Sequence, residues 1–525
     1  MSLGERIPNE STLINRRNAR TLLWIALSSL IGALVIFLLL QRLGLPTEIV
    51  IGSILVMMVA LFICMAWISR TMTSPMFFFA NRALGPFTSG LGSATDFLSG
   101  SLLILLFSIN LTSKMILATG LVLGIVFHAA LFSANIQRAG VLSLPGFFAW
   151  RFGSKFTGYL VLPIVTVVLL ALAMAEFQVA GALLQLMTGL SAQQAIWIVM
   201  ILAVLPSVFG GWSGLLLVNA SLAIWMLICA LIPASATGFL PSMLTSAQQA
   251  DLVDTPLQIL NLVDSTLLFP SDGALSTSWL ILTVLVLAAG FSVLPHALSR
   301  LSTNSQPLEA IESVGWVALM CFLMLSALPL SVGLIVGNPT SGKLAELLQN
   351  QPILQMLPYF VIVFAALNGL SATLFTAAAS IVRATNRLRN IDPGEQSVFL
   401  TRLTVLVLAG CLMAWPEEMI LTTEELLVGA LMLGAGALFV PLAAGIWLGS
   451  ISRWALNAAI ACGALVTAYL LYPLGPTILA LQAPVAAGAL GVATGIIIML
   501  IDRLAQLIRK KPVDPNASAR MLRRH

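Results

Sequence analysis

The sequence predicts an all-α membrane protein with about 14 transmembrane helices. The 525-residue chain is 59% hydrophobic and 9% charged, and its mean hydropathy is +1.02. Soluble domains carry about 25% charged residues, so a soluble core cannot account for this composition. The apolar residues gather in runs of about 20, the length that crosses a bilayer core. The basic residues stand at the ends of those runs and at the C-terminus, so the net charge of +5 does not indicate a nucleic-acid partner.

Fourteen apolar runs are expected to span the membrane. The first run is long and no small-residue cleavage pattern follows it, so we expect a retained helix rather than a signal peptide. The fourteen runs are 22–41, 47–69, 84–108, 115–136, 157–177, 192–209, 214–235, 278–298, 314–337, 353–384, 402–416, 425–447, 454–473 and 481–502.

The placement of Lys and Arg predicts the orientation. If the N-terminus is cytoplasmic, 22 of the 25 basic residues fall on the cytoplasmic side of these runs. The three exceptions are Arg42, Lys114 and Lys343. Cytoplasmic loops carry an excess of Lys and Arg, so we expect both termini in the cytoplasm and an even number of spans. We therefore expect a multi-pass protein of the cell membrane, or of the inner membrane if the source is bacterial, with the lipid bilayer as its surroundings.

The segments outside the two central sets of runs are expected to be terminal segments, peripheral helices or a loop. The segment 236–277 contains four Asp and neither Lys nor Arg, and it is either a short helix or lid, or a solvated connector. The other expected parts are a cytoplasmic N-terminal segment (1–21), two peripheral helices (22–69), two C-terminal helices (454–502) and a basic cytoplasmic tail (503–525).

Catalytic and cofactor motifs do not stand out in the sequence. The five cysteines sit singly in apolar segments, which suits neither metal-ligand spacing nor a disulfide framework. We find no HExxH zinc motif and no nucleophile elbow. We therefore expect neither an enzyme nor a cofactor-binding protein.

Two acids, Asp96 and Glu176, fall deep within predicted spans. An acid at the centre of a membrane helix costs about 2.5–3.5 kcal/mol on insertion scales, and such acids usually mark ion, proton or substrate pathways. Each is either a proton-coupling residue or a neutral acid bonded to a neighbouring helix. Asp96 stands among Gly, Ser and Thr residues in the stretch 90–103, and these small residues allow a helix to open and expose backbone groups to a cavity.

A second break is expected after Gly290 and Phe291, because Pro295 cannot donate to the helix ladder. His296 then lies near the cytoplasmic surface, either as a helix-end or loop histidine or as part of a proton relay. We expect no cationic residue deep in the core, so an anionic solute would rely on backbone amides, helix N-termini and hydroxyls such as those of Ser93 and Ser99. Transporters that use broken helices bind substrate and ions at such positions.

Five motifs in order resemble the sodium:solute symporter family, in particular its acetate or monocarboxylate permease-like branch. An acid followed by an aromatic, an aliphatic and Ser, as in Asp96-Phe97-Leu98-Ser99, resembles the first broken helix of that branch. The other four are Phe79-Ala80-Asn81-Arg82-Ala83-Leu84, Leu144-Pro145-Gly146-Phe147 with Arg151-Phe152, Gly210-Gly211-Trp212, and Leu294-Pro295-His296-Ala297-Leu298 with Arg300.

The resemblance implies a leucine-transporter-type fold, with two inverted five-helix repeats at about 84–235 and 278–447. The opposite orientation of these halves agrees with the charge count. The resemblance also implies a sodium site formed by Thr95 and Leu98 on the first helix and by Ala365, Asn368 and Gly369 on a later one. Asn368 and Gly369 stand where the family has hydroxyl side chains.

We therefore expect a secondary active transporter that couples a sodium or proton gradient to the symport of a small organic solute, such as a monocarboxylate, by alternating access. The alternative is a membrane sensor or accessory module that keeps the fold without transport. The sequence identifies no protein partner. The expected solute-binding residues are Ser93, Asp96, Ser99, Gly290 and Phe291.

Overall fold

All regular secondary structure is helical in the part of the chain that the structure describes. This computed structural model describes the following residues, together with scattered positions between 20 and 44: 47–108, 111–236, 277–335, 352–388, 394–415, 421–449, 451–471 and 484–508.

The described residues contain ten helices long and apolar enough to cross a membrane, or up to twelve spans if two bent helix pairs are included. Each of these twelve coincides with a predicted run, so hydropathy placed them correctly. Of the two remaining predicted runs, 47–69 contains helix α2 (Thr47–Ile68), whereas most of 22–41 lies outside the described residues. The predicted total of fourteen is therefore not confirmed.

The first half of the core consists of a bent pair, α4 and α5, followed by four further spans. Its helices are α4 (Pro86–Phe97), α5 (Gly100–Ser108), α6 (Leu111–Phe127) continuing through a π-helical segment (His128–Ser133) into α7 (Ala134–Ala139), the short α8 (Leu144–Phe152), α9 (Lys155–Thr188), α10 (Ala192–Gly210) and α11 (Trp212–Ala236).

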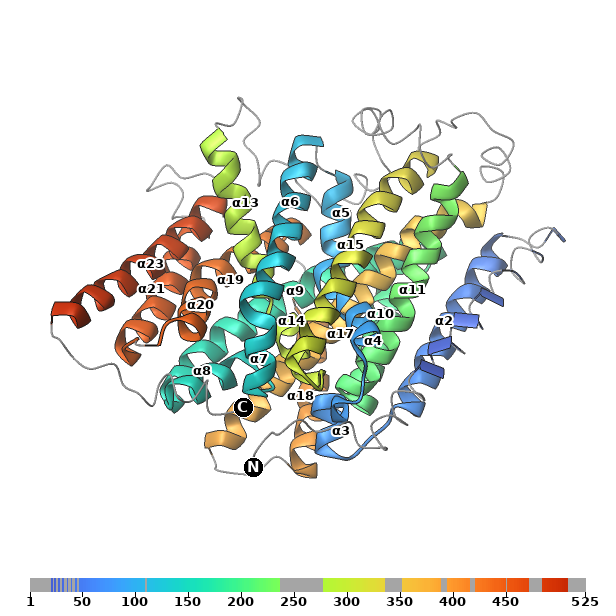
Figure 1. Ribbon diagram of the computed structural model, residues 1–525. Helices are drawn as coiled ribbons and strands as arrows, with labels where there is room; N and C mark the ends of the chain where they lie inside the picture. Colours follow the sequence, from blue (N-terminus) through green and yellow to red (C-terminus); the bar gives the residue numbers. More distant parts are fainter. Residues whose placement is uncertain are drawn as a thin grey trace.

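The second half repeats this order, with a bent pair followed by four spans. Its helices are α13 (Thr277–Ser292), α14 (Pro295–Arg300), α15 (Pro307–Ile335), α17 (Pro352–Leu388), α18 (Glu395–Met413), and α19 (Thr423–Gly434) continuing through a π-helical segment (Ala435–Phe439) into α20 (Val440–Trp447). In Figure 1 the chain rises from α4 to α5 and descends from α13 to α14, so the two halves run in opposite directions.

The flanking helices whose bounds lie within the described residues are α2, the short α3 (Ser74–Phe79), α21 (Arg453–Leu471) and α23 (Pro484–Ile508). Helix α23 continues six residues into the segment predicted as the cytoplasmic tail, 503–525, and the rest of that tail lies outside the described residues. The N-terminal segment 1–21 and the loop 236–277 also lie almost entirely outside them.

Both broken helices have a local cause. Helix α4 ends where Leu98 leaves helical geometry (φ −96°, ψ 67°), and the chain restarts as α5 with a bend of 52°. Gly100 permits this restart next to α17, because a Cβ at that position would lie 2.5 Å from the Ala366 Cβ. Pro295 occupies the first turn of α14, where its missing N–H costs nothing, and the bend there is 41°. The two breaks predicted from Gly-rich and Pro-containing stretches are confirmed.

Helices α9 and α17 form the centre of the bundle and pack along each other. Every residue of α17 from Leu357 to Ser380 is buried, and α11 and α18 also pack against this helix. Both bent pairs contact this centre, since α5 packs on α9 and α17, and α14 packs on the same two helices. The breaks therefore lie against the two helices at the centre of the bundle.

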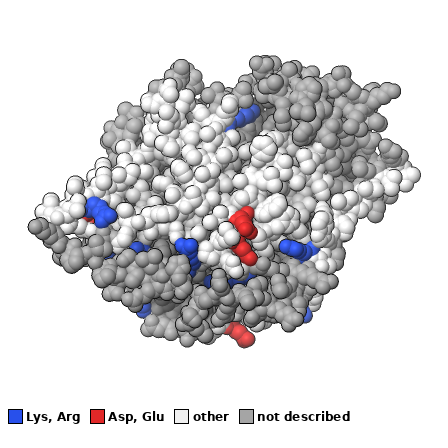
Figure 2. All heavy atoms as spheres, in the orientation of Figure 1, with Lys and Arg blue, Asp and Glu red and all other residues white. Residues whose placement is uncertain are grey.

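Charged side chains are unevenly placed on the face shown in Figure 2. Most of the visible Lys and Arg residues lie in the lower half of this view, and one lies near the top. This end of the molecule carries α7, α8 and α3 in Figure 1. The distribution agrees with the basic end that the charge count assigns to the cytoplasm.

Candidate functional site

The centre of the site is an ion pair that joins the two broken helices. Asp96 lies in the last turn of α4, and Arg300 is the last residue of α14. The Asp96 Oδ1 and the Arg300 Nη2 are 2.8 Å apart, and the two residues are 3% and 1% exposed. A charge buried to this degree is stable only when it is paired and hydrogen-bonded.

Arg300 makes further contacts that connect the pair to the helices around it. Its Nη1 donates to the backbone oxygen of Gly92, and its guanidinium lies 5.0 Å from the centre of the Trp212 ring. When the Asn219 amide is oriented with its oxygen toward Arg300, that oxygen accepts from Nη2 at 2.8 Å. In this orientation the Asn219 nitrogen donates to the Asn368 Oδ1 at 2.9 Å. One guanidinium thus links α4, α11 and, through Asn219, α17.

This arrangement corrects three expectations from the sequence. Arg300 was counted as a cytoplasmic residue and no cation was expected in the core, and both expectations are wrong. His296, expected near the cytoplasmic surface, is also buried, and its Nε2–H donates to the Asp96 backbone oxygen at 3.3 Å. The reason is that Pro295 begins a new helix instead of ending the span, so the chain stays in the core through Arg300.

Glu176 on α9 holds the start of α5. Its Oε2 accepts from the backbone N–H of Gly100 at 2.8 Å and from that of Ser101 at 3.3 Å, and the Ser101 hydroxyl donates to its Oε1. The first amides of a helix have no partner within the helix, and the helix dipole favours a negative charge there. Glu176 is 1% exposed, and it fills this anion position with a carboxyl group of the protein itself.

Asp96, Glu176 and His296 line one small cavity between the breaks. The cavity has a volume of about 10 Å³, which holds about one water molecule. Ser99 and Phe291, two of the predicted solute-binding residues, also line it. Ser93 and Gly290 do not: the Ser93 hydroxyl donates to the Ser89 oxygen within α4, and Gly290 packs against Leu431 of α19.

The five predicted sodium ligands lie at the end of α4 and on α17, which pack together. The Asn368 Oδ1 accepts the hydrogen bond from Asn219, and Gly369 faces Glu176. A Cβ at position 369 would lie 3.0 Å from the Glu176 Cγ, so Glu176 takes the space that a side chain there would need. The sodium site stays a prediction. Its members, Thr95, Leu98, Ala365, Asn368 and Gly369, are all buried.

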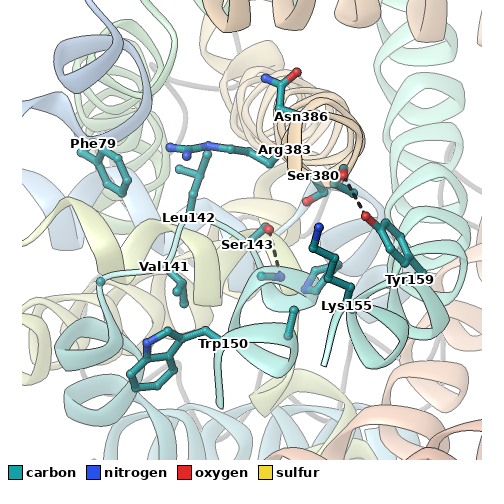
Figure 3. Close-up of a pocket in the computed structure, with 16 residues that line it drawn as sticks. Phe79, Val141, Leu142, Ser143, Trp150, Lys155, Tyr159, Ser380, Arg383 and Asn386 are labelled. Atoms are coloured by element: carbon teal, nitrogen blue, oxygen red, sulfur yellow. Dashed lines mark hydrogen bonds between the residues drawn. The ribbon is translucent and has the colours of Figure 1, made fainter. Parts of the chain in front are cut away.

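A second, larger pocket opens between α8, α9 and α17, and Figure 3 shows it in close-up. Its volume is about 320 Å³, which falls in the range of small-molecule sites. Lys155 of α9 and Arg383 of α17 line it, and no Asp or Glu is among the described residues that do so. Arg383 stacks on Phe78 at 4.9 Å from the ring centre, and the Tyr159 hydroxyl donates to the Ala384 oxygen at 3.4 Å. We call this pocket the basic vestibule.

A stripe of small and polar residues on α17 connects the cavity to the basic vestibule. The spacing of four and three residues places its members on one face of the helix. Gly369 and Thr373 line the cavity, and Ser380 and Arg383 line the vestibule. Thr376, which is buried, lies between them. The distance from Thr373 to Ser380 along the helix is about 10 Å.

Comparison with known proteins identifies the family. The model of the sodium:solute symporter family matches residues 77–343, which is just over half of the chain. The chain belongs to the sodium:solute symporter family. Members of this family are transporters, so the protein is a membrane transporter rather than an enzyme. No curated protein matches the chain.

Solved structures with the same fold include a Na⁺-coupled sialic acid symporter in a substrate-bound, outward-open state. It is 14% identical, with a TM-score of 0.66 over 86% of this chain and 96% of that one. Two further structures are more distant. They are a manganese transporter mutant from Eremococcus coleocola (15% identity, TM-score 0.47, 81% and 96% covered) and a nucleobase-cation-symport-1 family transporter in a closed conformation (15%, 0.48, 85% and 97%). The symporter likeness confirms the leucine-transporter-type fold of two inverted repeats.

Among the site residues of this symporter-family chain, sequence reasoning did not identify Arg300 or Asn219 as site residues, and it placed His296 near the cytoplasmic surface. The sequence did carry a signal for the ion pair. Pro295 can begin a helix that ends at Arg300 with no acid beside the Arg, and the other predicted break contains an acid, Asp96, with no base beside it. Two broken helices that meet would bring these opposite charges together. The basic vestibule was also missed, although Ser380 and Arg383 continue the polar face of the predicted span.

Proposed function

We propose that this protein is a secondary active transporter that couples a cation gradient to the uptake of a small organic solute by alternating access. The observation that carries the proposal is the meeting of two broken helices with Asp96, Arg300 and Glu176 at their ends. Irregular backbone and buried charges at this depth are costly in a membrane, and they persist where they serve transport. Family membership supports the same class of function.

The charges at the site favour coupling to a monovalent cation. Asp96 and Arg300 neutralise each other, which leaves Glu176 as the unmatched negative charge. A buried negative charge attracts a cation, and both sodium and a proton suit a carboxylate. The family name and the five predicted ligands speak for sodium, whereas the loss of the hydroxyls at positions 368 and 369 speaks for a proton.

A monocarboxylate is the solute class that the charge distribution fits best. The basic vestibule presents Lys155 and Arg383 and, among its described lining residues, no acid, so its potential attracts anions. The central cavity holds about one water molecule, so a solute enters it only after the broken helices move. The breaks at Leu98 and Leu294 are the natural hinges for this movement.

The proposed orientation places both termini in the cytoplasm of a cell whose membrane the protein spans, so that the basic vestibule faces the cytoplasm. The repeats 84–235 and 278–447 would then form the moving core, and the helices of 22–69 and 454–502 would surround it. The segment 236–277 would lie outside the cell. Cysteine accessibility to a membrane-impermeant reagent at Lys155 and at Lys114, which lie at opposite ends of the charge pattern, tests this orientation.

A sensor or accessory module that binds solute without transporting it is the second candidate. The missing hydroxyls at Asn368 and Gly369 favour it, because they leave the predicted sodium site with fewer oxygens. The two functions differ in solute exchange. A transporter loaded with unlabelled solute accumulates labelled solute by counterflow, whereas a sensor does not.

The test uses the purified full-length protein in proteoliposomes, with radiolabelled acetate, pyruvate and lactate as probes. Uptake is measured with an inward sodium gradient, with an inward proton gradient, with both and with neither, next to protein-free liposomes. We expect counterflow of at least one monocarboxylate and accumulation under one of the two gradients. Binding without counterflow would establish the sensor. Accumulation that ignores both gradients would refute cation coupling.

A further inference from the structure

Building on the proposed function, on which this inference rests, we propose that the basic vestibule is a second binding site for the solute. Arg383, Lys155 and Ser380 hold the carboxylate there before the solute leaves the protein. A larger anion with an apolar tail also fits this site, and it occupies the site from one side of the membrane without being transported.

The two cavities of the structure differ in the size of what they can hold. The central cavity has a volume of about 10 Å³, which is room for about one water molecule and not for a monocarboxylate. The basic vestibule has a volume of about 320 Å³. In the described conformation the solute therefore has a place in the vestibule but none between the broken helices.

Two full positive charges dominate the electrostatics of the vestibule. Lys155 is the first residue of α9 and Arg383 lies on α17, and the described lining residues include no acid. The starts of α8 and α9 also face this pocket, but α17 ends nearby at Leu388 with the opposite end of its dipole. These partial charges of about half a unit oppose one another, so the two side chains decide the sign, and the pocket favours an anion.

Arg383 is held so that it can bind a carboxylate. Its guanidinium lies 4.9 Å from the centre of the Phe78 ring and 5.7 Å from that of Phe79. Stacking on aromatic rings leaves the in-plane N–H groups of a guanidinium for hydrogen bonds, and a carboxylate matches their geometry. The Arg383 Nε has no hydrogen-bond partner within the described part of the chain.

Ser380 supplies a second, neutral donor on the same face of α17, three residues before Arg383. Ser380 is 1% exposed and lines the vestibule, and its hydroxyl has no hydrogen-bond partner among the described residues. Other hydroxyls of this helix face bond a carbonyl one turn earlier, as Thr376 does to Ala372 at 2.7 Å. A buried hydroxyl without a partner is costly, and a carboxylate oxygen beside Arg383 would accept its hydrogen bond.

The other side of the vestibule is apolar. In Figure 3, Val141 and Trp150 lie at one edge of the pocket, and Ser380 and Tyr159 lie at the opposite edge. An anion with its head on Arg383 and Ser380 would therefore place an apolar tail toward Trp150. Each methylene group that is buried there strengthens binding by up to about fourfold.

Gly146 provides variants that differ by one charge in the wall of this site. It lines the vestibule at the third position of α8, where its N–H donates to the Ser143 hydroxyl at 3.3 Å. A Cβ there would lie 3.1 Å from the Ser143 Oγ, which is the end of a side chain and can shift. Glu and Gln at this position both complete a capping box with Ser143, so both suit the start of α8. Comparing Gly146→Glu with Gly146→Gln isolates the added negative charge.

The experiment measures the KM for radiolabelled acetate, pyruvate and lactate from each face of the membrane, in inside-out and right-side-out vesicles. In the proposed orientation, inside-out vesicles present the vestibule to the medium. On that face we expect a KM about 10-fold higher in Gly146→Glu than in Gly146→Gln, because the added acid repels the carboxylate. On the other face the two variants should agree within about twofold.

Hexanesulfonate is the probe for a larger anion, because it stays charged and does not cross the bilayer as a neutral acid. It should inhibit uptake from the vestibule face, about 10-fold more strongly in Gly146→Gln than in Gly146→Glu, and it should not inhibit from the other face. In proteoliposomes this inhibition should persist when phosphatidylglycerol replaces part of the phosphatidylcholine. Its loss would show that a lipid headgroup occupies the vestibule, which would overturn the inference.

Gln194→Glu is the matched control, because it makes the same exchange of Gln for Glu at the third position of α10. Gln194 forms a capping box with Ser191 and is exposed, away from the vestibule. Its KM should stay within about twofold of wild type on both faces. The Tm of both Gly146 variants should not fall more than about 1 °C below that of wild type, so that a change in KM reports charge and not unfolding.

Different results separate the second site from the proposed function. If wild type shows no counterflow of any of the three anions, the solute class is wrong and the second site fails with it. If wild type exchanges them but Gly146→Glu and Gly146→Gln have the same KM on both faces, transport stands and the second site alone is refuted.

Discussion

Replacing Arg300 with Met should destabilise the protein strongly, because it leaves Asp96 buried without its partner. At the observed 2.8 Å, the attraction between the two unit charges is about 6 kcal/mol with an effective dielectric constant of about 20. Much of this offsets the cost of burying both charges, and removing one partner of a buried pair costs about 3–5 kcal/mol. The substitution also removes the hydrogen bonds to Gly92 and Asn219.

The assay is thermal unfolding of the purified protein in detergent. The unfolding entropy of a chain of this length corresponds to a shift of about 1 °C per kcal/mol, so Arg300→Met should lower the Tm by about 3–5 °C. The double variant with Asp96→Asn removes both charges and should recover at least half of that loss, since the unpaired acid is gone. Arg453→Met, at an exposed position, is the control and should leave the Tm within 1 °C of wild type. Equal Tm values for wild type and Arg300→Met, or additive effects in the double variant, would refute the ion-pair interpretation.

Three further changes test other parts of the structure. Gly369→Ser should push the Glu176 side chain away from α5 and lower the rate of monocarboxylate uptake about 10-fold, which corresponds to an overpacking cost of about 1.4 kcal/mol. Adding Glu176→Ala should restore the space for the serine side chain. The double variant should then show a rise in Tm with NaCl that KCl does not produce. Uptake by Gly369→Ser at the wild-type rate would contradict the packing. Arg383→Ala should raise the KM for anion efflux about 10-fold without changing the Tm, whereas Arg383→Lys should keep most of the affinity for the anion. An unchanged KM in Arg383→Ala would exclude the basic vestibule from the solute path. Gly463→Ala should lower the Tm by about 1–3 °C, because the new methyl group overlaps the Gly436 backbone oxygen between α21 and the π-helical segment, and an unchanged Tm would show that this contact relaxes freely.

Hydropathy predicted the spans well because each membrane helix carries its own signal in consecutive residues. The boundaries were less exact where polar residues face the protein interior. Helix α9 was expected to end at 177 but continues to Thr188, because Glu176 and Gln178 interrupt the apolar run without interrupting the helix. Gln178 bonds the Leu421 oxygen and Thr423, so its polarity is satisfied inside the protein and does not mark a helix end.

The breaks were also readable from the sequence, since Gly and Pro act on the backbone within a few residues. The partners of the charged residues could not be predicted from the sequence, because they come from distant parts of the chain. Asp96 and Arg300 belong to opposite halves, and Glu176 meets α5 across a helix interface. A hydropathy window treats Arg300 as the start of a loop, and only the fold shows that Asp96 lies beside it. Pairing between distant residues is therefore the part of the site that needed the structure.

The Asp96–Arg300 contact has a consequence for how the chain is made. A ribosome produces the acid long before the base, so for most of synthesis the first broken helix carries a lone carboxyl group into the bilayer. The nascent first half is thus less stable in the membrane on its own, and it is stabilised when Arg300 of the second half pairs with Asp96. A chain truncated before Arg300 would keep an unpaired Asp96 in the membrane, and quality-control proteases could recognise this feature of an incomplete protein.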